Sequence, residues 1–277
     1  MKTLVIAGGT DGIGRHLTET HVRRGDHVVV VGRDEVKGKA VVSAADGPGR
    51  AEFARADLSL LAETRALVTD LADRLPAIDA LVLCARHYRS TRTVTREGIE
   101  ENFALFYLSR FLLGHGLRST LEAAPVPVIV NVAGPGGDLS LVRWDDLQLR
   151  RGYHGGLALG QGGKLNDLLG VSFAEQYAGG ATRYVLVHPG VTATGFSGTY
   201  DRETLAHIDH MKRHAKPVRA AAEPISRLIE APPAAPLSAF VEGEPLGVTG
   251  RGFAPASARR LDVLTRELLS VTRIDLP

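Results

Sequence analysis

A strand-like run that opens into a glycine turn near the N-terminus constrains the fold of this chain most. Residues 3–7 (TLVIA) predict a buried strand, and Gly8, Gly12 and Gly14 follow with the spacing G-x-x-x-G-x-G before a helical segment that starts at Ile13. Residues without a Cβ let the backbone turn sharply and approach a pyrophosphate closely. The free N–H groups at the start of the helix would face its phosphates. The stretch predicts a dinucleotide site, with an ordinary turn that binds nothing as the alternative.

Composition fits one α/β domain and argues against several kinds of partner. The chain has 277 residues, of which 44% are hydrophobic, so it can bury one large core. Its net charge of +2 comes from interspersed acidic and basic residues without a basic block. We therefore expect no nucleic acid and no anionic membrane surface as a partner, and a small molecule as the ligand.

Cysteine content and hydropathy predict a cytoplasmic protein. Cys84 is the single cysteine, so no intrachain disulfide framework is possible, and its apolar neighbours favour a small core residue in a reducing compartment. No apolar run reaches the ~18 residues that a membrane span needs. Because residue 3 already begins a predicted strand, we expect no signal peptide.

Strand-like and helix-like stretches alternate along the whole sequence. Apolar runs predict further strands at 27–31, 51–55, 79–85, 126–132, 183–187 and 238–242, and helical spacing predicts helices at 13–24, 60–75, 97–121, 160–177 and 256–271. This alternation predicts a Rossmann-type, doubly wound parallel sheet of about seven strands with right-handed crossovers and helices on both faces. We expect residues 1–277 to form a single domain.

The segment 195–236 interrupts this alternation and is the candidate for a lid over the substrate. It holds two predicted helices, near 201–215 and 218–230, and no predicted strand. Three histidines share one face of the first helix: His207, His210 and His214. A metal site there is conceivable, but no cysteine or acidic residue is placed to complete it, so a solvated helix face and no metal are favoured.

Polar residues at two strand ends indicate which dinucleotide is bound. A basic side chain after the second strand matches a 2′-phosphate, whereas an acidic one would accept from the ribose hydroxyls. Arg33 follows Gly32 there, which favours NADP over NAD, although Asp34 moderates the preference and a solvated arginine is the alternative. Asp57 follows the third strand, where it could accept from the adenine amino group or cap the next helix.

Several landmarks in this order resemble the short-chain dehydrogenase/reductase superfamily over essentially the whole chain. They are the glycine turn 8–14, Asp57-Leu58, the LVLCA run at 81–85, VNV at 130–132, Lys164-Leu165-Asn166 and PGVTAT at 189–194. The resemblance implies an NAD(P)-binding Rossmann domain, with NADPH preferred and NADH possible. The cofactor contacts that it implies are Gly8, Gly9, Thr10, Asp11, Gly12, Ile13, Gly14, Arg33, Asp57, Leu58, Cys84, Ala85, Arg86, Lys164, Pro189, Gly190, Val191, Thr192 and Thr194.

The sequence departs from the family at the catalytic positions. Family members that reduce ketones use a serine, a tyrosine four residues before a lysine, and an asparagine on the long helix. Aligned with them, this chain has Gly134 at the serine position, Gly160 at the tyrosine position and Phe106 at the asparagine position. Lys164 alone is retained, and the resemblance implies that it orients the nicotinamide ribose.

The missing tyrosine leaves the proton source to be explained. Hydride delivery to a carbonyl creates an alkoxide, and general acid help is worth typically about 10²- to 10⁴-fold. Tyr153 and Ser140 lie in the intervening loop, but their spacing does not support them as replacements. A phenol beside the ketone could supply the proton itself, and aromatic polyketides carry that arrangement.

The missing residues also resemble those of atypical members of this superfamily that reduce angucyclinones, and this resemblance implies an NADPH-dependent ketoreductase that acts on an angucyclinone-type aromatic polyketide in antibiotic biosynthesis. Two alternatives stay open. A catalytically silent NADP-binding sensor or scaffold would also keep the cofactor residues without the catalytic ones, and a redox-neutral isomerase or cyclase would use the pocket alone.

Overall fold

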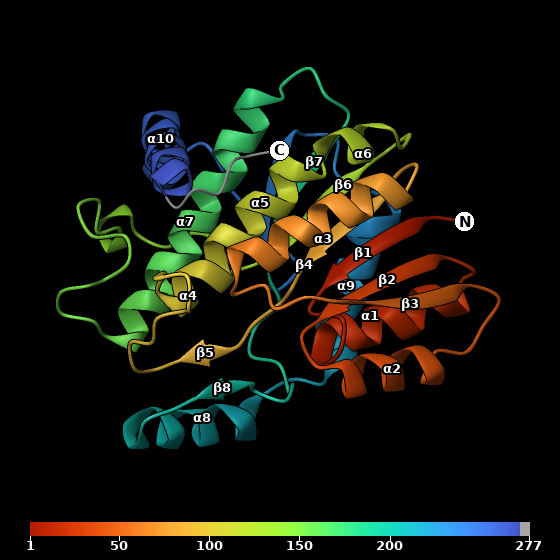
Figure 1. Cartoon of the computed structure of the whole chain (residues 1–277), viewed down its shortest axis with the longest axis horizontal. Coiled ribbons are helices and arrows are strands. Elements are labelled where there is room, and N and C mark those ends of the chain that lie inside the picture. The colour runs from red at the N-terminus through yellow and green to blue at the C-terminus, as the bar shows by residue number, and fades with distance from the viewer. Residues whose placement is uncertain (272–277) are drawn as a thin grey trace.

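A central sheet of eight strands organises the computed structural model, which describes residues 1–271 (Figure 1). In spatial order the strands are β10 (Glu244–Leu246), β9 (Leu237–Val241), β7 (Arg183–His188), β6 (Val128–Val132), β4 (Ala80–Leu83), β1 (Thr3–Ala7), β2 (His27–Gly32) and β3 (Arg50–Arg55). Seven of them run parallel, and β10 pairs antiparallel with β9. The expected Rossmann-type sheet is confirmed. The eighth strand, β10, has only three residues, and the sequence did not predict it.

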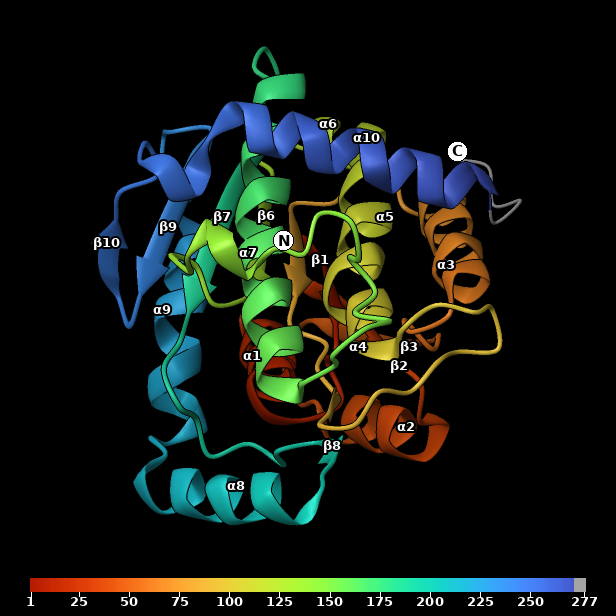
Figure 2. The ribbon, with the colours of Figure 1, turned by 90° about the vertical axis from the view of Figure 1, so that its left-hand side faces the viewer.

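Both faces of the sheet are covered by helices, which is why its central strands are apolar at successive positions (Figures 1 and 2). Leu4, Val5 and Ile6 of β1 are fully buried, as are Val28–Val31 of β2. One face packs against α1 (Gly12–Arg23), α2 (Glu35–Ala44) and α9 (Val218–Glu230). The other packs against α3 (Leu61–Arg74), α5 (Ser109–Gly116), α7 (Gly155–Gln176) and α10 (Pro255–Val271).

The long helix expected at 97–121 is divided into shorter elements. These are α4 (Glu101–Phe103), a π-helical turn η1 (Ala104–Leu108), α5, and α6 (Arg118–Glu122). The Glu100 carboxylate caps the start by accepting from the N–H groups of Asn102 and Phe103, so the helix begins later than its apolar spacing predicts. At the π turn, the Asn166 amide donates to the Phe106 carbonyl at 2.7 Å. Such turns insert an extra residue and often occur at functional sites.

The expected lid at 195–236 consists of two parts with different roles. A short strand, β8 (Gly198–Thr199), pairs with β5 (Tyr88–Arg89) in a separate two-stranded sheet, so the prediction of no strand in this segment was wrong. The following helix α8 (Arg202–His214) lies beside β8, away from the main sheet (Figure 2). Helix α9 is not part of a lid, because Ala222, Ile225 and Ile229 are buried in the core.

Within the described residues, no helix has both the length and the apolar content to cross a bilayer.

Candidate active site

A cavity of about 1320 Å³ lies at the carboxyl ends of the parallel strands and extends beneath β8 and α8. In open α/β sheets, ligands bind at this edge. Its walls come from the glycine turn, the residues that follow β2, β4, β6 and β7, the start of α7, and one side of α8. Pockets for single small molecules typically measure about 300–1,000 Å³, so this one has room for a dinucleotide and a second molecule.

The glycine turn forms a close-packed cradle between β1, α1 and the end of β4. Gly8 has φ +88°, and a Cβ there would lie 2.6 Å from the Ala85 backbone. A Cβ on Gly14 would lie 2.2 Å from the carbonyl oxygen of Gly8. Asp11 caps α1 by accepting from the Gly12 N–H at 2.7 Å. The turn and the helix N-terminus fit a pyrophosphate, because both approach a ligand with backbone N–H groups.

Replacing Gly14 by alanine should weaken NADPH binding by about 10- to 100-fold, because the turn must open to admit the methyl group at a cost of about 1–3 kcal/mol. The matched control is Gly114→Ala in α5, where a Cβ would meet only an Ile129 methyl at 3.7 Å. Equilibrium titration of NADPH fluorescence measures both variants. Equal NADPH affinity in Gly14→Ala and Gly114→Ala would contradict a binding role for the turn.

Most of the residues expected to contact the cofactor line this one cavity. Those in its wall are Gly8, Thr10, Asp11, Gly12, Ile13, Gly14, Arg33, Asp57, Leu58, Cys84, Ala85, Arg86, Pro189, Gly190, Val191, Thr192 and Thr194. Gly9 does not line it. A Cβ on Gly9 would lie 2.9 Å from the Val30 side chain, so this glycine serves the packing of β1 on β2 instead. Cys84 is half-buried, and its thiol donates to the Ala7 carbonyl at 3.2 Å.

Lys164 also lies outside the cavity wall, contrary to the expected ribose contact. Its Nζ lies 2.7 Å from the Asp167 carboxylate and donates to the Gly252 carbonyl at 2.9 Å. Both charged side chains are fully buried, and Asp167 also accepts from the Gly136 N–H. Burial raises the pKa of Asp167 to about 6. Asp167, one turn further along α7, holds the Lys164 ammonium away from the cavity. The pair also joins α7 to the loop after β6 and to η3 (Arg251–Phe253).

The residues after β2 bring two cations, Arg33 and Lys37, to the cavity wall. Asp34 caps α2 by accepting from the Lys37 N–H at 3.0 Å, so its carboxylate is engaged. Arg33 is exposed in the cavity wall. Burial, followed by the charges of Arg33 and Arg89, lowers the pKa of His87 to about 4. This part of the wall is therefore positive and suits a phosphate.

Asp57 remains in the wall near this positive region and does not cap α3. Its Oδ1 accepts from the N–H and the hydroxyl of Ser59, at 3.0 and 2.6 Å. The α3 N-terminus is capped instead by Glu97, which accepts from the N–H groups of Leu61 and Ala62. The capping alternative for Asp57 was wrong.

Gly134, Gly160 and Phe106 all line the cavity, so the three departures from the family pattern lie around one space. A Cβ on Gly134 would meet only the His188 ring, at 3.8 Å, and one on Gly160 would meet only Leu141, at 3.3 Å. These glycines are not required by backbone crowding. Their effect is to widen the cavity where larger side chains would stand.

The two loop residues considered as replacement acids are not free to act. The Tyr153 hydroxyl lines the cavity but accepts from the Asn102 amide at 2.6 Å and donates to the Arg89 carbonyl at 3.0 Å. Burial raises the pKa of Tyr153 well above its ordinary value. Ser140 is exposed in η2 (Leu139–Leu141) and lies outside the cavity wall.

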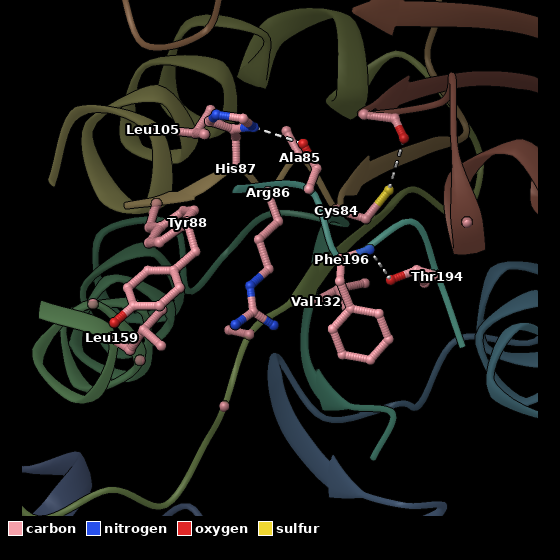
Figure 3. Close-up of a pocket in the computed structure, with 18 of the residues that line it drawn as sticks. Cys84, Ala85, Arg86, His87, Tyr88, Leu105, Val132, Leu159, Thr194 and Phe196 are labelled. Carbon is pink, nitrogen blue, oxygen red and sulfur yellow. Dashed lines mark hydrogen bonds between the residues drawn. The ribbon is translucent and has the colours of Figure 1, made fainter. Parts of the chain in front are cut away.

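Aromatic residues of the wall were not identified as site residues from the sequence. Tyr88 of β5 and Tyr200 after β8 place their rings 5.8 Å apart, and Phe196 lies across from Tyr88 (Figure 3). The signal for Tyr88 was the polar stretch 86–89 at a strand end, which marks a ligand edge without naming a role, and Phe196 and Tyr200 had no comparable signal. On α8, His207 lines the cavity beside Met211, and residues 1–271 contain no cluster of potential metal ligands.

A family model described as short chain dehydrogenase matches residues 2–144, which is half of the chain. The chain belongs to the short-chain dehydrogenase/reductase family of oxidoreductases. This short-chain dehydrogenase/reductase is 32% identical over 197 residues to the "Putative daunorubicin C-13 ketoreductase DnrU" of Streptomyces sp. strain C5, covering 70% of this chain and 67% of that protein. It is 30% identical over 194 residues to retinol dehydrogenase 12 of Bos taurus, covering 69% and 61%. It spans roughly half to two thirds of the length of such curated relatives.

Solved structures share the fold of this short-chain dehydrogenase/reductase. A short chain dehydrogenase from Burkholderia cenocepacia in complex with NADP superposes with a TM-score of 0.67 at 17% identity, covering 88% of this chain and 97% of the other. One from Sphingobium yanoikuyae in complex with NADPH gives 0.65 at 20% identity, covering 98% and 95%. At these identities the likeness establishes the fold alone.

Proposed function

We propose that this protein is an NADPH-dependent ketoreductase that reduces an angucyclinone-type aromatic polyketide in antibiotic biosynthesis and takes the final proton from the substrate. The observation that carries the proposal is a cavity of about 1320 Å³ at the strand ends, in which Gly134 and Gly160 stand where the family's serine and tyrosine are expected. The ketoreductase name of the Streptomyces relative supports the reaction type. The same pattern of missing residues resembles the angucyclinone ketoreductase of simocyclinone biosynthesis, which supports the substrate class. The single cysteine supports a cytoplasmic location.

The residues that would hold the cofactor follow the cavity wall from one end to the other. The glycine turn would hold the pyrophosphate, Arg33 the 2′-phosphate, Asp57 the adenine, and residues 189–194 the nicotinamide side. When bound, the reduced nicotinamide supplies a hydride. The apolar and aromatic wall, which includes Phe106 and Phe196, would exclude water from a planar substrate.

In the proposed reaction, the substrate itself is the proton source. A phenol next to the ketone is hydrogen-bonded to the carbonyl oxygen before the reaction begins. Its O–H bond breaks as the O–H bond to the former carbonyl oxygen forms, so the negative charge moves from the alkoxide oxygen to the phenol oxygen. The widened space at Gly134 and Gly160 admits the fused rings that hold phenol and ketone in this arrangement.

The direct test mixes the protein with NADPH and a panel of hydroxylated polycyclic ketones, and follows the absorbance of reduced nicotinamide. Oxidation at substrate-dependent rates supports the proposal. Tight NADPH binding without consumption across the panel would instead support a sensor or scaffold, and product formation without consumption would support an isomerase or cyclase.

Arg33→Ala should lower kcat/KM for NADPH by about 10- to 100-fold and leave that for NADH within about twofold, because a charged hydrogen bond to phosphate is worth about 1.5–3 kcal/mol. Lys39→Ala is the matched control, since Lys39 is a neighbouring exposed cation of α2 that pairs with Glu35 outside the cavity. Steady-state rates with both cofactors provide the measurement. An equal loss with NADPH and NADH would argue against 2′-phosphate recognition by Arg33.

A further inference from the structure

Arg86 places an unpaired cation inside the cavity. It follows β4 by three residues, and its side chain extends into the space between Tyr88 and Phe196 (Figure 3). Within residues 1–271, no hydrogen bond or ion pair holds its guanidinium. Arg110 provides the contrast, because that guanidinium also lines the cavity but donates to the Asn131 side chain and, at 2.9 Å, to the Val132 carbonyl.

Among the described residues, no carboxylate pairs with Arg86. The titratable side chains that face it are Tyr88, Tyr200, His188 and Arg110. Arg86 is exposed to the open cavity, and the residues packed around it lower its pKa through desolvation. A cation held this way by a folded protein is stabilised when an anion enters beside it.

The position of Arg86 in the cavity indicates whether a cofactor phosphate or a substrate anion would bind beside it. The resemblance to the family placed Arg86 among the cofactor contacts, but the pyrophosphate would lie at the glycine turn and the 2′-phosphate at Arg33, and Arg86 belongs to neither of these two phosphate sites. The groups that Arg86 faces are tyrosines of β5 and of the segment after β8, together with His188 at the end of β7. This is the side of the cavity that lies under β8 and α8. The cofactor phosphates would not occupy it, so it is open to the substrate.

We propose that Arg86 is a catalytic residue whose guanidinium binds the paired oxygens of a hydroxyaryl ketone and stabilises the negative charge on them. The planar guanidinium presents two parallel N–H groups, which match two adjacent oxygens of one ligand. The inference rests on the proposed function for the identity of the reacting oxygen.

The step balances as follows. The carbonyl carbon gains a hydride, which the bound cofactor loses as it is oxidised, and the C=O π pair moves to oxygen. The phenol proton then passes to that oxygen, leaving an alcohol and a phenolate. The phenolate charge lies against Arg86 until product release, when water returns a proton to it.

The first test needs no reductant. The probe is 1-hydroxyanthraquinone, whose colour changes when its phenol ionises, and 1-methoxyanthraquinone is the matched ligand that cannot ionise. Bound to the wild-type protein, the phenol pKa should fall by at least about one unit, a tenfold change in its ionisation constant. Arg86→Gln should return it to the value of the free probe, and Arg86→Lys should keep part of the shift.

The second test measures turnover with NADPH and a hydroxyaryl ketone. Arg86→Gln should lower kcat by about 10²-fold, as loss of one oxyanion donor does, while NADPH affinity changes less than twofold. Because Arg86 makes no internal bond, Arg86→Gln should fold normally. Loss of NADPH binding, an unchanged probe pKa, or no binding of the probe to wild type would overturn the proposal. A shifted probe pKa without any ketone reduction would leave Arg86 as an anion site and refute the ketoreductase instead.

Discussion

Lys164→Met is expected to lower the free energy of unfolding by about 3–5 kcal/mol, because it leaves the buried Asp167 carboxylate without its partner. Burial already raises the pKa of Asp167 to about 6, and removal of the ammonium would raise it further. Since a raised carboxyl pKa means that the folded state takes up a proton more readily, the loss of stability should be smaller at pH 5 than at pH 8. Urea unfolding at the two pH values measures both effects.

The double variant Lys164→Met/Asp167→Leu separates pairing from cofactor binding. It removes both charges, so it should recover most of the lost stability. Its NADPH dissociation constant should stay within about twofold of wild type, because the Lys164 ammonium lies outside the cavity wall. A stable double variant that no longer binds NADPH would show that Lys164 contacts the cofactor.

The order of strands and helices could be predicted because buried parallel strands leave a direct trace in the sequence. Runs such as Val28–Val31 are apolar at every position since helices cover both faces of the sheet. The strands that were missed lack this trace, and helix α2 (Glu35–Ala44) was missed as well. β5 and β8 contain two residues each, and β10 contains three, so no periodicity can develop in them.

The cofactor wall could be predicted in large part, because it consists of strand ends and a glycine turn that are close in sequence to recognisable patterns. The partner that a given side chain meets in the fold could not be predicted. The resemblance to the family predicts a cofactor contact for Lys164, but its ammonium pairs with the Asp167 carboxylate three residues later. Arg86 is the opposite case, because only the fold shows that no acidic partner reaches it.

The extent of the lid was misjudged for a similar reason. Both predicted helices at 201–215 and 218–230 are present as α8 and α9. Only packing distinguishes them: α9 buries Ala222 and Ile225 against the sheet, whereas α8 buries Ile208 and leaves Leu205 exposed. Amphipathic spacing identifies an apolar helix face but not the surface that covers it.

Methylating the phenol beside the reacting ketone is expected to lower kcat by about 10²- to 10⁴-fold, the usual worth of a general acid. In the proposed reaction the phenol O–H is the proton donor, and Gly160 offers none. Moving the methyl group to a phenol remote from the ketone is the control for added bulk, and should change kcat less than about threefold. NADPH affinity should be equal with both ligands.

Tyr153 lines the cavity, as Tyr88, Tyr200 and His188 also do, and is the loop residue considered as a replacement for the phenol. Because the Tyr153 hydroxyl already bonds to Asn102 and to the Arg89 carbonyl, Tyr153→Phe should cost stability of about 1 kcal/mol per lost bond and leave reduction of the free phenol substrate intact.

The most direct measurement is the single-turnover rate of NADPH oxidation, by stopped flow, for a hydroxyaryl ketone and its neighbouring methyl ether on wild type and on Tyr153→Phe. We predict fast oxidation with the free phenol on both proteins and a rate at least about 10²-fold slower with the ether on both. Equal rates for phenol and ether on wild type, with oxidation abolished in Tyr153→Phe, would contradict a proton supplied by the substrate.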